Sequence, residues 1–215
     1  MEIVINILLP IVSLIIALVA IFQTKKQIVL SNKQYLFDRR LEKYIIIKDL
    51  LLLFANNREL IVDKKDLAGC LDFQFYLLTN VSYLSDMIFA IKEPLNSDKQ
   101  NIFLTKCETL EKYAVEISLL WDNDIGKIFG KFIKTYKEVL FKLYQQKVCI
   151  NGLKKDREKQ YCIGNSMIDL DTYKKQTLEN AKEIKLFETI QNLDDIYCRI
   201  INENLEQKLI DDLKL

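Results

Sequence analysis

The chain opens with one long apolar run. Residues 3–22 read IVINILLPIVSLIIALVAIF and contain no charged side chain. At about 1.5 Å per residue, a helix of this length spans about 30 Å, which is the thickness of the hydrocarbon core of a bilayer. We therefore expect residues 1–24 to form a single transmembrane anchor. The alternative is a cleaved signal peptide, but its amino-terminal region should be basic, and here it holds Glu2.

The small and polar residues of the run fall on one side of the expected helix. At 100° per residue, six of them lie within about 40° of a common line, and we call them the anchor face: Asn6, Pro10, Ser13, Ala17, Ala20 and Thr24. In lipid, small residues mark close helix packing, and polar residues mark helix partners or water. The pattern predicts a self-associating anchor, whose face would line a pore if it met water. The alternative is a plain anchor in which these residues align by chance.

Positive charge follows the apolar run, whereas only the amino terminus and Glu2 precede it. The basic residues nearest the anchor are Lys25, Lys26, Lys33, Arg39 and Arg40. Because cationic flanks stay in the cytoplasm, we expect a bacterial inner-membrane protein with a cytoplasmic carboxyl-terminal domain. We also expect these five cations to lie near anionic lipid headgroups.

Apolar residues recur at helical spacing through the rest of the chain. We predict a stalk helix over residues 25–60 that continues the anchor. Three further helices are expected over 66–92, which Pro94 ends, over 97–121, and from 122 or 123 to about 146. Residues 147–165 contain Gly152 and Gly164 and predict a surface loop, and a fifth helical region follows from 169 or 171. Gly126 and Gly130, four residues apart, indicate close approach of another helix.

The fold class expected from this pattern is all-α, with an anchor over residues 1–24 and a cytoplasmic helical domain over residues 25–215. The low content of helix breakers agrees, because the chain holds only 5 Gly and 2 Pro. A formal net charge of +1 argues against a DNA-binding protein.

Candidate chemistry is sparse. There is no histidine, which excludes Ser-His-Asp catalysis and His-ligated zinc, and the five cysteines form no Cys-x-x-Cys pair. The sequence also lacks a Gly-rich phosphate loop. Asp194–Asp195 and Asp211–Asp212 could contribute to a hard-metal site, but a charged helix face explains them better. We therefore expect no enzyme activity, no metal site and no cofactor.

One short constellation resembles a known active site. HEPN ribonucleases are helical bundles that carry Arg, a gap of four to six residues, and then His on a late helix. Arg199 and Asn204 resemble this spacing, with Asn in place of the catalytic His, so a general base is lacking. The alternative is structural: Arg199 can form i,i+4 ion pairs with Asp195 and Glu203.

Together, the anchor, the run SNKQYLFDRRLEKY (residues 31–44) and the HEPN-like spacing resemble the membrane-anchored accessory proteins of RNA-targeting type VI CRISPR systems. The resemblance implies an oligomeric pore with a cytoplasmic HEPN-like bundle that amplifies anti-phage defence by compromising the inner membrane. It implies as partners the lipid bilayer, further copies of the chain, and RNA or an RNA-guided effector complex. The missing His puts nuclease activity in doubt, but not pore formation.

Three hypotheses of function remain open at this stage. The first is an oligomeric membrane effector, whose stalk could hold subunits together through heptad-like contacts. The second is a membrane-tethered scaffold or sensor that recruits a cytoplasmic partner. The third is a degenerate HEPN-like RNA-binding bundle, for which the Lys-rich stretch 127–147 gives support, although a solvated helix face explains that stretch equally well.

Overall fold

A computed structural model describes residues 2–62, 67–121, 124–162 and 170–213, with side chains described over 11–62, 71–121, 124–155 and 172–213. The elements in chain order are α1 (Glu2–Val62), α2 (Leu67–Thr79), the 3₁₀ helix η1 (Ser85–Met87), α3 (Ile88–Lys92), α4 (Ser97–Leu120), α5 (Asp124–Cys162), α6 (Leu170–Glu183), α7 (Leu186–Asn202) and α8 (Leu205–Asp211). These ranges contain no β-strand, so the all-α prediction is confirmed.

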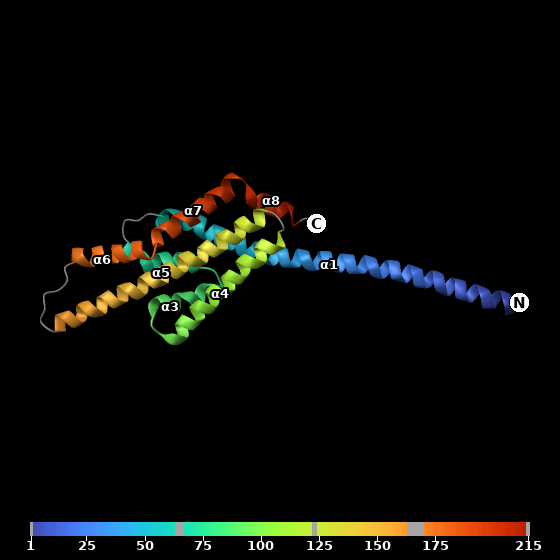
Figure 1. The fold of residues 1–215 in the computed structure, drawn as a ribbon, viewed down its shortest axis with the longest axis horizontal. Helices are drawn as coiled ribbons and strands as arrows, with labels where there is room; N and C mark the ends of the chain where they lie inside the picture. The colour runs from blue at the N-terminus through green and yellow to red at the C-terminus, as the bar shows by residue number, and fades with distance from the viewer. Residues whose placement is uncertain (1, 63–66, 122–123, 163–169, 214–215) are drawn as a thin grey trace.

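Helix α1 is a single helix of 61 residues, and its first part stands clear of the rest of the molecule (Figure 1). Every described side chain from Ile11 to Tyr35 is exposed, and the first buried one is Lys43. The sequence explains the continuity, because α1 contains no Gly and its one Pro lies at position 10. The prediction that the stalk continues the first helix without a break is confirmed.

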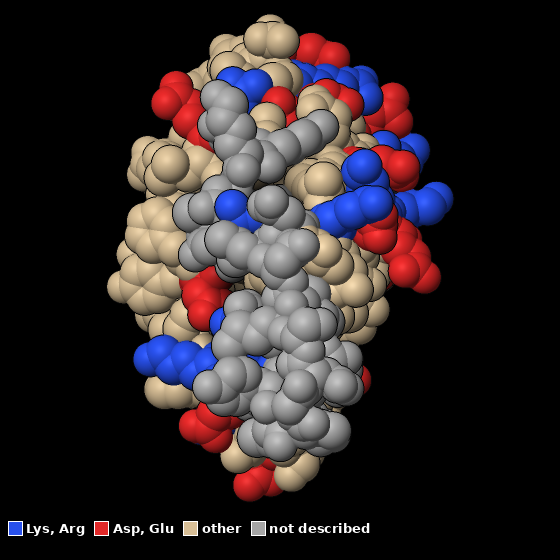
Figure 2. All heavy atoms as spheres, turned by 90° about the vertical axis from the view of Figure 1, so that its left-hand side faces the viewer, with Lys and Arg blue, Asp and Glu red and all other residues tan. Residues whose placement is uncertain are grey.

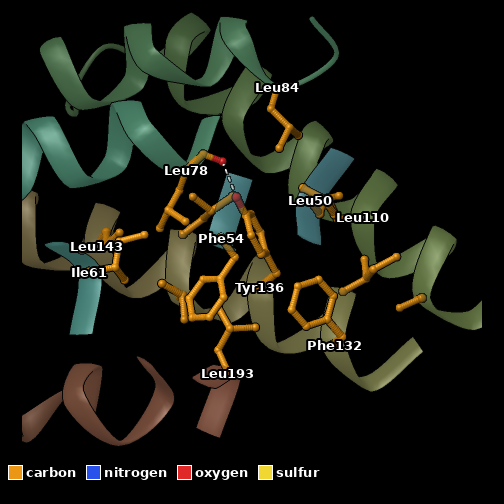
Figure 3. Close-up of a cluster of buried hydrophobic side chains, with 14 of the residues drawn as sticks. Leu50, Phe54, Ile61, Leu78, Leu84, Leu110, Phe132, Tyr136, Leu143 and Leu193 are labelled. Atoms are coloured by element: carbon orange, nitrogen blue, oxygen red, sulfur yellow. Dashed lines mark hydrogen bonds between the residues drawn. The ribbon is translucent and has the colours of Figure 1, made fainter. Parts of the chain in front are cut away.

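Helix α5 is the centre of the bundle. It packs most extensively against α4 and α7, and the second half of α1 packs on the same assembly (Figure 1). Its inward side is rich in aromatic and branched residues, and the fully buried ones include Phe129, Phe132, Ile133, Tyr136, Val139 and Leu140. Figure 3 shows Phe54 of α1 and Leu193 of α7 meeting this side around Phe132 and Tyr136. The bundle is therefore closed around one continuous apolar core.

The two glycines at the start of α5 lie where the sequence predicts a close helix contact. A β-carbon on Gly130 would lie 2.6 Å from the carbonyl oxygen of Ala114 in α4, and would also strike the Ser118 hydroxyl. A β-carbon on Gly126 would lie 3.1 Å from the carbonyl oxygen of Ile117. The prediction is confirmed, because both glycines let α5 approach the backbone of α4.

The region predicted as one helix over 66–92 is broken. Helix α2 ends at Thr79, and η1 and α3 follow after a turn. The end of α2 is held by side chains, since Thr79 donates its hydroxyl hydrogen bond to the carbonyl of Phe75 and Tyr136 donates one of 2.7 Å to the carbonyl of Leu78. The predicted cap, Asp66, lies outside the described residues. Helix α3 ends at Lys92, two residues before Pro94, as expected.

The prediction of a loop over 147–165 is wrong as far as residue 162, because α5 continues to Cys162; residues 163–165 lie outside the described part. The helix continues because Ile150 is buried and Gln146 donates a hydrogen bond of 2.8 Å to the carbonyl of Thr177 in α6. Gly152 faces open space, and in an exposed helix position glycine costs only about 1 kcal/mol relative to alanine.

Two other boundaries differ from expectation. The side chain that caps α4 belongs to Asn96 and not to Ser97, since its oxygen accepts from the backbone NH groups of Asp98 and Lys99. The region after residue 169 is not one helix but three. Lys185 and Asn204 separate them, and both adopt left-handed backbone angles, with φ of 58° and 50°.

Candidate functional site

The most elaborate polar arrangement lies where α1 enters the bundle, and we call it the joint: Arg40, Lys43 and Tyr44 with their partners on α4 and α8. Arg40 donates hydrogen bonds of 3.0 Å to the carbonyls of Leu120 and Asp212, at the ends of α4 and α8. Its guanidinium also lies 5.8 Å from the ring of Trp121. A cation suits these carbonyls, because helix carboxyl ends carry partial negative charge.

One turn further along α1, Lys43 is almost fully buried. Its ammonium group lies 2.8 Å from a carboxylate oxygen of Glu116, 3.0 Å from one of Glu42, and 4.0 Å from the ring centre of Tyr113. Burial alone would lower the pKa of Lys43, but hydrogen bonds to the two carboxylates outweigh it and raise the pKa. Lys43 therefore stays charged and ties α1 to α4.

Tyr44 completes the joint on the side of α8. Its hydroxyl group donates a hydrogen bond of 3.1 Å to Glu206. Burial and the neighbouring carboxylate raise the pKa of Tyr44 to about 12. Three neighbouring residues of α1 thus fasten the helix to both α4 and α8, so the angle at which α1 leaves the bundle is fixed by side-chain contacts.

A second fastening holds the other end of α1. Arg58 makes a two-pronged ion pair with Asp194 of α7, in which one guanidinium nitrogen lies 2.9 Å from the second carboxylate oxygen. The same nitrogen lies 3.2 Å from the sulfur of Cys198. Asp194 is thus paired with Arg58, and the described residues contain no cluster of three candidate metal ligands.

The first part of α1 is long and apolar enough to cross a membrane, by length and composition, and none of that stretch is buried in the protein. On the anchor face, Ser13, Ala17 and Ala20 are exposed, and Thr24 donates a hydrogen bond of 2.8 Å to the carbonyl of Ala20. The side chains of Asn6 and Pro10 lie outside the described residues. Because α1 is one helix, the six residues keep the angular arrangement expected from the sequence.

The five basic residues after the apolar run separate into two groups. Lys25, Lys26 and Lys33 are exposed on the free part of α1. Arg39 lies 3.6 Å from Glu42 and Arg40 belongs to the joint, and their nearness to lipid stays a prediction. The 18 residues from Phe22 to Arg40 correspond to about 27 Å of helix.

The HEPN-like pair, Arg199 and Asn204, lies on the surface of the protein around the end of α7. Arg199 is exposed and lies 2.8 Å from Glu203, which confirms one of the two ion pairs expected from the sequence. Asp195, the other expected partner, accepts a hydrogen bond from Gln191. Asn204 is also exposed and lies beyond the end of α7, at one of the left-handed positions.

Three of the six lysines in the stretch 127–147 lie beside acidic residues of neighbouring helices. Lys137 lies 2.6 Å and Lys134 lies 3.7 Å from Glu111, and Lys147 lies 2.6 Å from Asp72. At the end of the bundle away from α1, the visible Lys and Arg are interspersed with Asp and Glu (Figure 2). No field of positive charge that would suit RNA is therefore seen among the described residues of that face.

An open groove of about 720 Å³ runs between α4 and α5. Its floor contains Leu104 and Phe141 with the buried thiol of Cys107, whose pKa burial raises to about 12. The ion pairs of Glu111 with Lys134 and Lys137 lie at its rim. Apart from Cys107, the groove is lined by apolar side chains and by Glu and Lys side chains, and these ion pairs cross it, as in a packing seam between two helices.

Comparisons with known proteins do not add to this picture. No protein-family model, no curated protein and no solved structure matches the chain. Helix α1 carries both the apolar span and the joint. The sequence did not indicate the roles of Lys43 or of the Arg58–Asp194 pair, because the partners are far apart in the chain and no local spacing reports them.

Proposed function

We propose that the protein is an oligomeric, membrane-anchored effector that perturbs the bacterial inner membrane, with a pore through the assembled anchors as its most direct form. The observation that carries the proposal is the continuity of α1. One unbroken helix contains the apolar span, and the joint fastens it to α4 and α8.

A rigid connection has a purpose in an effector that it lacks in a simple tether. A tether needs only a flexible linker, whereas a helix clamped at Arg40, Lys43 and Tyr44 converts any rotation of the bundle into rotation or tilt of the anchor. The anchor face supplies the surface through which such a movement would alter contacts between anchors. Cationic Lys25 and Lys26 favour the orientation with the bundle in the cytoplasm.

A role in anti-phage, CRISPR-associated defence is supported by the resemblance of residues 31–44 and of the Arg199–Asn204 spacing. Part of the first stretch also has a structural explanation, because Arg40 and Tyr44 are joint residues. A functional test of the resemblance asks whether phage challenge triggers the membrane activity described next.

The test follows membrane potential with a voltage-sensitive dye in bacteria that make the full chain, with and without phage. We expect the wild type to depolarise the membrane and Asn6→Leu/Ser13→Leu to abolish this effect at equal expression, because both changes fill the anchor face. Ile15→Leu/Leu18→Ile is the matched control, since it alters the opposite, apolar side at constant hydrophobicity. If the wild type fails to depolarise the membrane both with and without phage, the proposal is overturned.

The tethered scaffold remains a second candidate because the bundle exposes apolar side chains. Phe73 and Tyr76 on α2 are 53% and 48% exposed, and Leu119 on α4 is 76% exposed. Such residues are common at protein interfaces. If an unrelated single-pass anchor replaces residues 1–24 with full retention of function, the scaffold is the better account.

The degenerate RNA-binding bundle has less support, given the paired lysines and the exposed Arg199–Glu203 pair. Loss of RNA binding in Arg199→Ala, with an unchanged fold, would revive it.

A further inference from the structure

Three residues of the anchor face, Asn6, Ser13 and Ala20, begin a longer seven-residue repeat that runs along α1 toward the joint. Positions seven residues apart hold only small, uncharged polar or apolar side chains: Asn6, Ser13, Ala20, Gln27, Gln34 and Leu41. A strict seven-residue repeat in a long helix is the pattern of a left-handed coiled coil. The repeat therefore links the anchor to the part of α1 that lies between the membrane and the bundle.

In the stalk, exposed apolar residues lie at and between the positions of this repeat. We define the stalk seam as Gln27, Leu30, Gln34, Phe37 and Leu41, which follow one another at intervals of three and four residues. Leu30 is 56% exposed, and Phe37 and Leu41 are each 37% exposed. The described remainder of the chain leaves Leu30 open and covers Phe37 and Leu41 only in part.

We propose that the stalk seam binds the same seam of a second copy of this chain, with the two helices parallel and in register. The inference rests on the proposed function only in placing the anchor in a membrane. Copies with one sequence insert with one orientation and to one depth, so each seam meets an identical seam at the same height. Membrane confinement also raises the effective concentration, which allows a contact of about two heptads to persist.

Charges beside the seam agree with a parallel partner. Lys33 lies on one side of the seam and Asp38 on the other, five residues further on. Residues five apart on one helix point about 140° away from each other, so they cannot pair within the chain. In a parallel coiled coil, however, a residue on one side of the seam lies beside the residue five positions further on in the partner helix. Lys33 of one copy can therefore pair with Asp38 of the other. Both side chains are exposed and available for this contact.

The two glutamines of the seam favour the in-register alignment of the two helices. Gln27 and Gln34 would each face their own counterpart, and paired amides can hydrogen-bond to each other across the contact. A polar residue at such a core position lowers stability but penalises shifted alignments, in which the amide would meet Leu30 or Phe37. The seam thus specifies its own alignment.

The first test is disulfide formation in membranes that contain the full chain. Phe37→Cys should give an intermolecular disulfide on mild oxidation, because two copies of the residue would face each other. Tyr35→Cys is the matched control, since Tyr35 is 64% exposed on the same helix but off the seam. The wild type shows the background from its own cysteines. Equal cross-linking of the two variants, or none at position 37, would overturn the proposal.

The second test is rescue by charge reversal in the Phe37→Cys chain. Lys33→Glu alone and Asp38→Lys alone should each lower cross-linking severalfold, because each places like charges at the contact. The double variant Lys33→Glu/Asp38→Lys should restore it. Failure of the double variant to recover would contradict the Lys33–Asp38 contact, and with it the parallel register.

These tests are separable from the proposed function. Cross-linking at position 37 without depolarisation by the wild type would retain the seam and remove the effector proposal. Depolarisation without cross-linking at position 37 would retain the effector and remove the seam.

Discussion

Arg39 and Arg40 are adjacent in the sequence but have different roles in the structure. Arg39 makes an exposed contact within α1, with Glu42. Arg40 bonds to the last carbonyl of α4 and to the end of α8, so it contacts segments 80 and 172 residues away. At this scale the sequence could identify a basic pair, but only the fold shows which of the two is structural.

Arg40→Ala should lower the free energy of unfolding by about 1 to 2 kcal/mol, because it removes two hydrogen bonds from a charged donor. Arg39→Ala should change it by less than about 0.5 kcal/mol, as is usual for an exposed ion pair. The measurement is urea unfolding of the full chain in detergent, followed by fluorescence of Trp121, the one tryptophan of the chain, which is buried beside Arg40. Equal effects of the two substitutions would show that the joint does not form.

Tyr136 has a buried hydroxyl group that titrates outside the usual range. Burial raises the pKa of Tyr136 well above 10.0, while the hydroxyl donates its hydrogen bond to Leu78 (Figure 3). The neutral form is therefore favoured in the folded protein. Because the pKa of Tyr136 is higher in the folded than in the unfolded chain, its contribution to the free energy of unfolding is fully present below pH 10. That contribution is lost as the pH rises above 10, where the tyrosine of the unfolded chain ionises first.

Tyr136→Phe should cost about 1 to 2 kcal/mol at pH 7, because the carbonyl of Leu78 loses its partner. The difference from the wild type should narrow above pH 10, since phenylalanine does not ionise. Unfolding experiments between pH 7 and pH 11 measure both effects. Tyr35→Phe, at a position 64% exposed, is the control and should show neither. A difference that is constant with pH would contradict the assigned burial.

Among the helices, α5 contains two glycines in opposite environments. A β-carbon on Gly130 would collide with α4, whereas one on Gly152 would meet nothing within 4 Å. Gly130→Ala should therefore destabilise the protein by about 1 to 3 kcal/mol through overpacking. Gly152→Ala should stabilise it by up to about 1 kcal/mol, because alanine favours a helix. The measurement is thermal unfolding of both variants; no effect at Gly152 would show that α5 ends earlier in solution.

The helices also show how far a single sequence reaches. Periodicity predicted α1 and α4 well, because their apolar spacing is long and uninterrupted. It failed for α5 past residue 146, where Gly152 and a cluster of charges imitate a loop, although burial of Ile150 continues the helix. It also failed near Thr79, because the end of α2 depends on Tyr136, which is 58 residues from Leu78 in the chain. Of the candidate site, the anchor face followed from helical geometry, whereas the joint depends on long-range contacts.

At the scale of the whole molecule, the two proposals have the anchor face and the stalk seam of one α1 meet neighbouring copies of the chain. Two alanines inserted between Thr24 and Lys25 would rotate these surfaces relative to each other by about 200°, whereas seven would rotate them by a net of only about 20°. We expect depolarisation, and cross-linking through Phe37→Cys, to be lost with two residues and retained with seven. The seven-residue insertion adds more length but less rotation than the two-residue insertion, so added length alone would not explain a loss with two residues. The reverse order would contradict a shared neighbour.

The length of the free part of α1 has a consequence for access. About 27 Å of helix separates Phe22 from Arg40, so in the proposed membrane orientation the bundle would be raised above the lipid rather than rest on it. The space beneath is tall enough for a small soluble protein to enter from the side. In that orientation, a cytosolic protease could cut after Lys25, Lys26 or Lys33 and release a folded bundle, which would end the proposed membrane activity without unfolding any of the core.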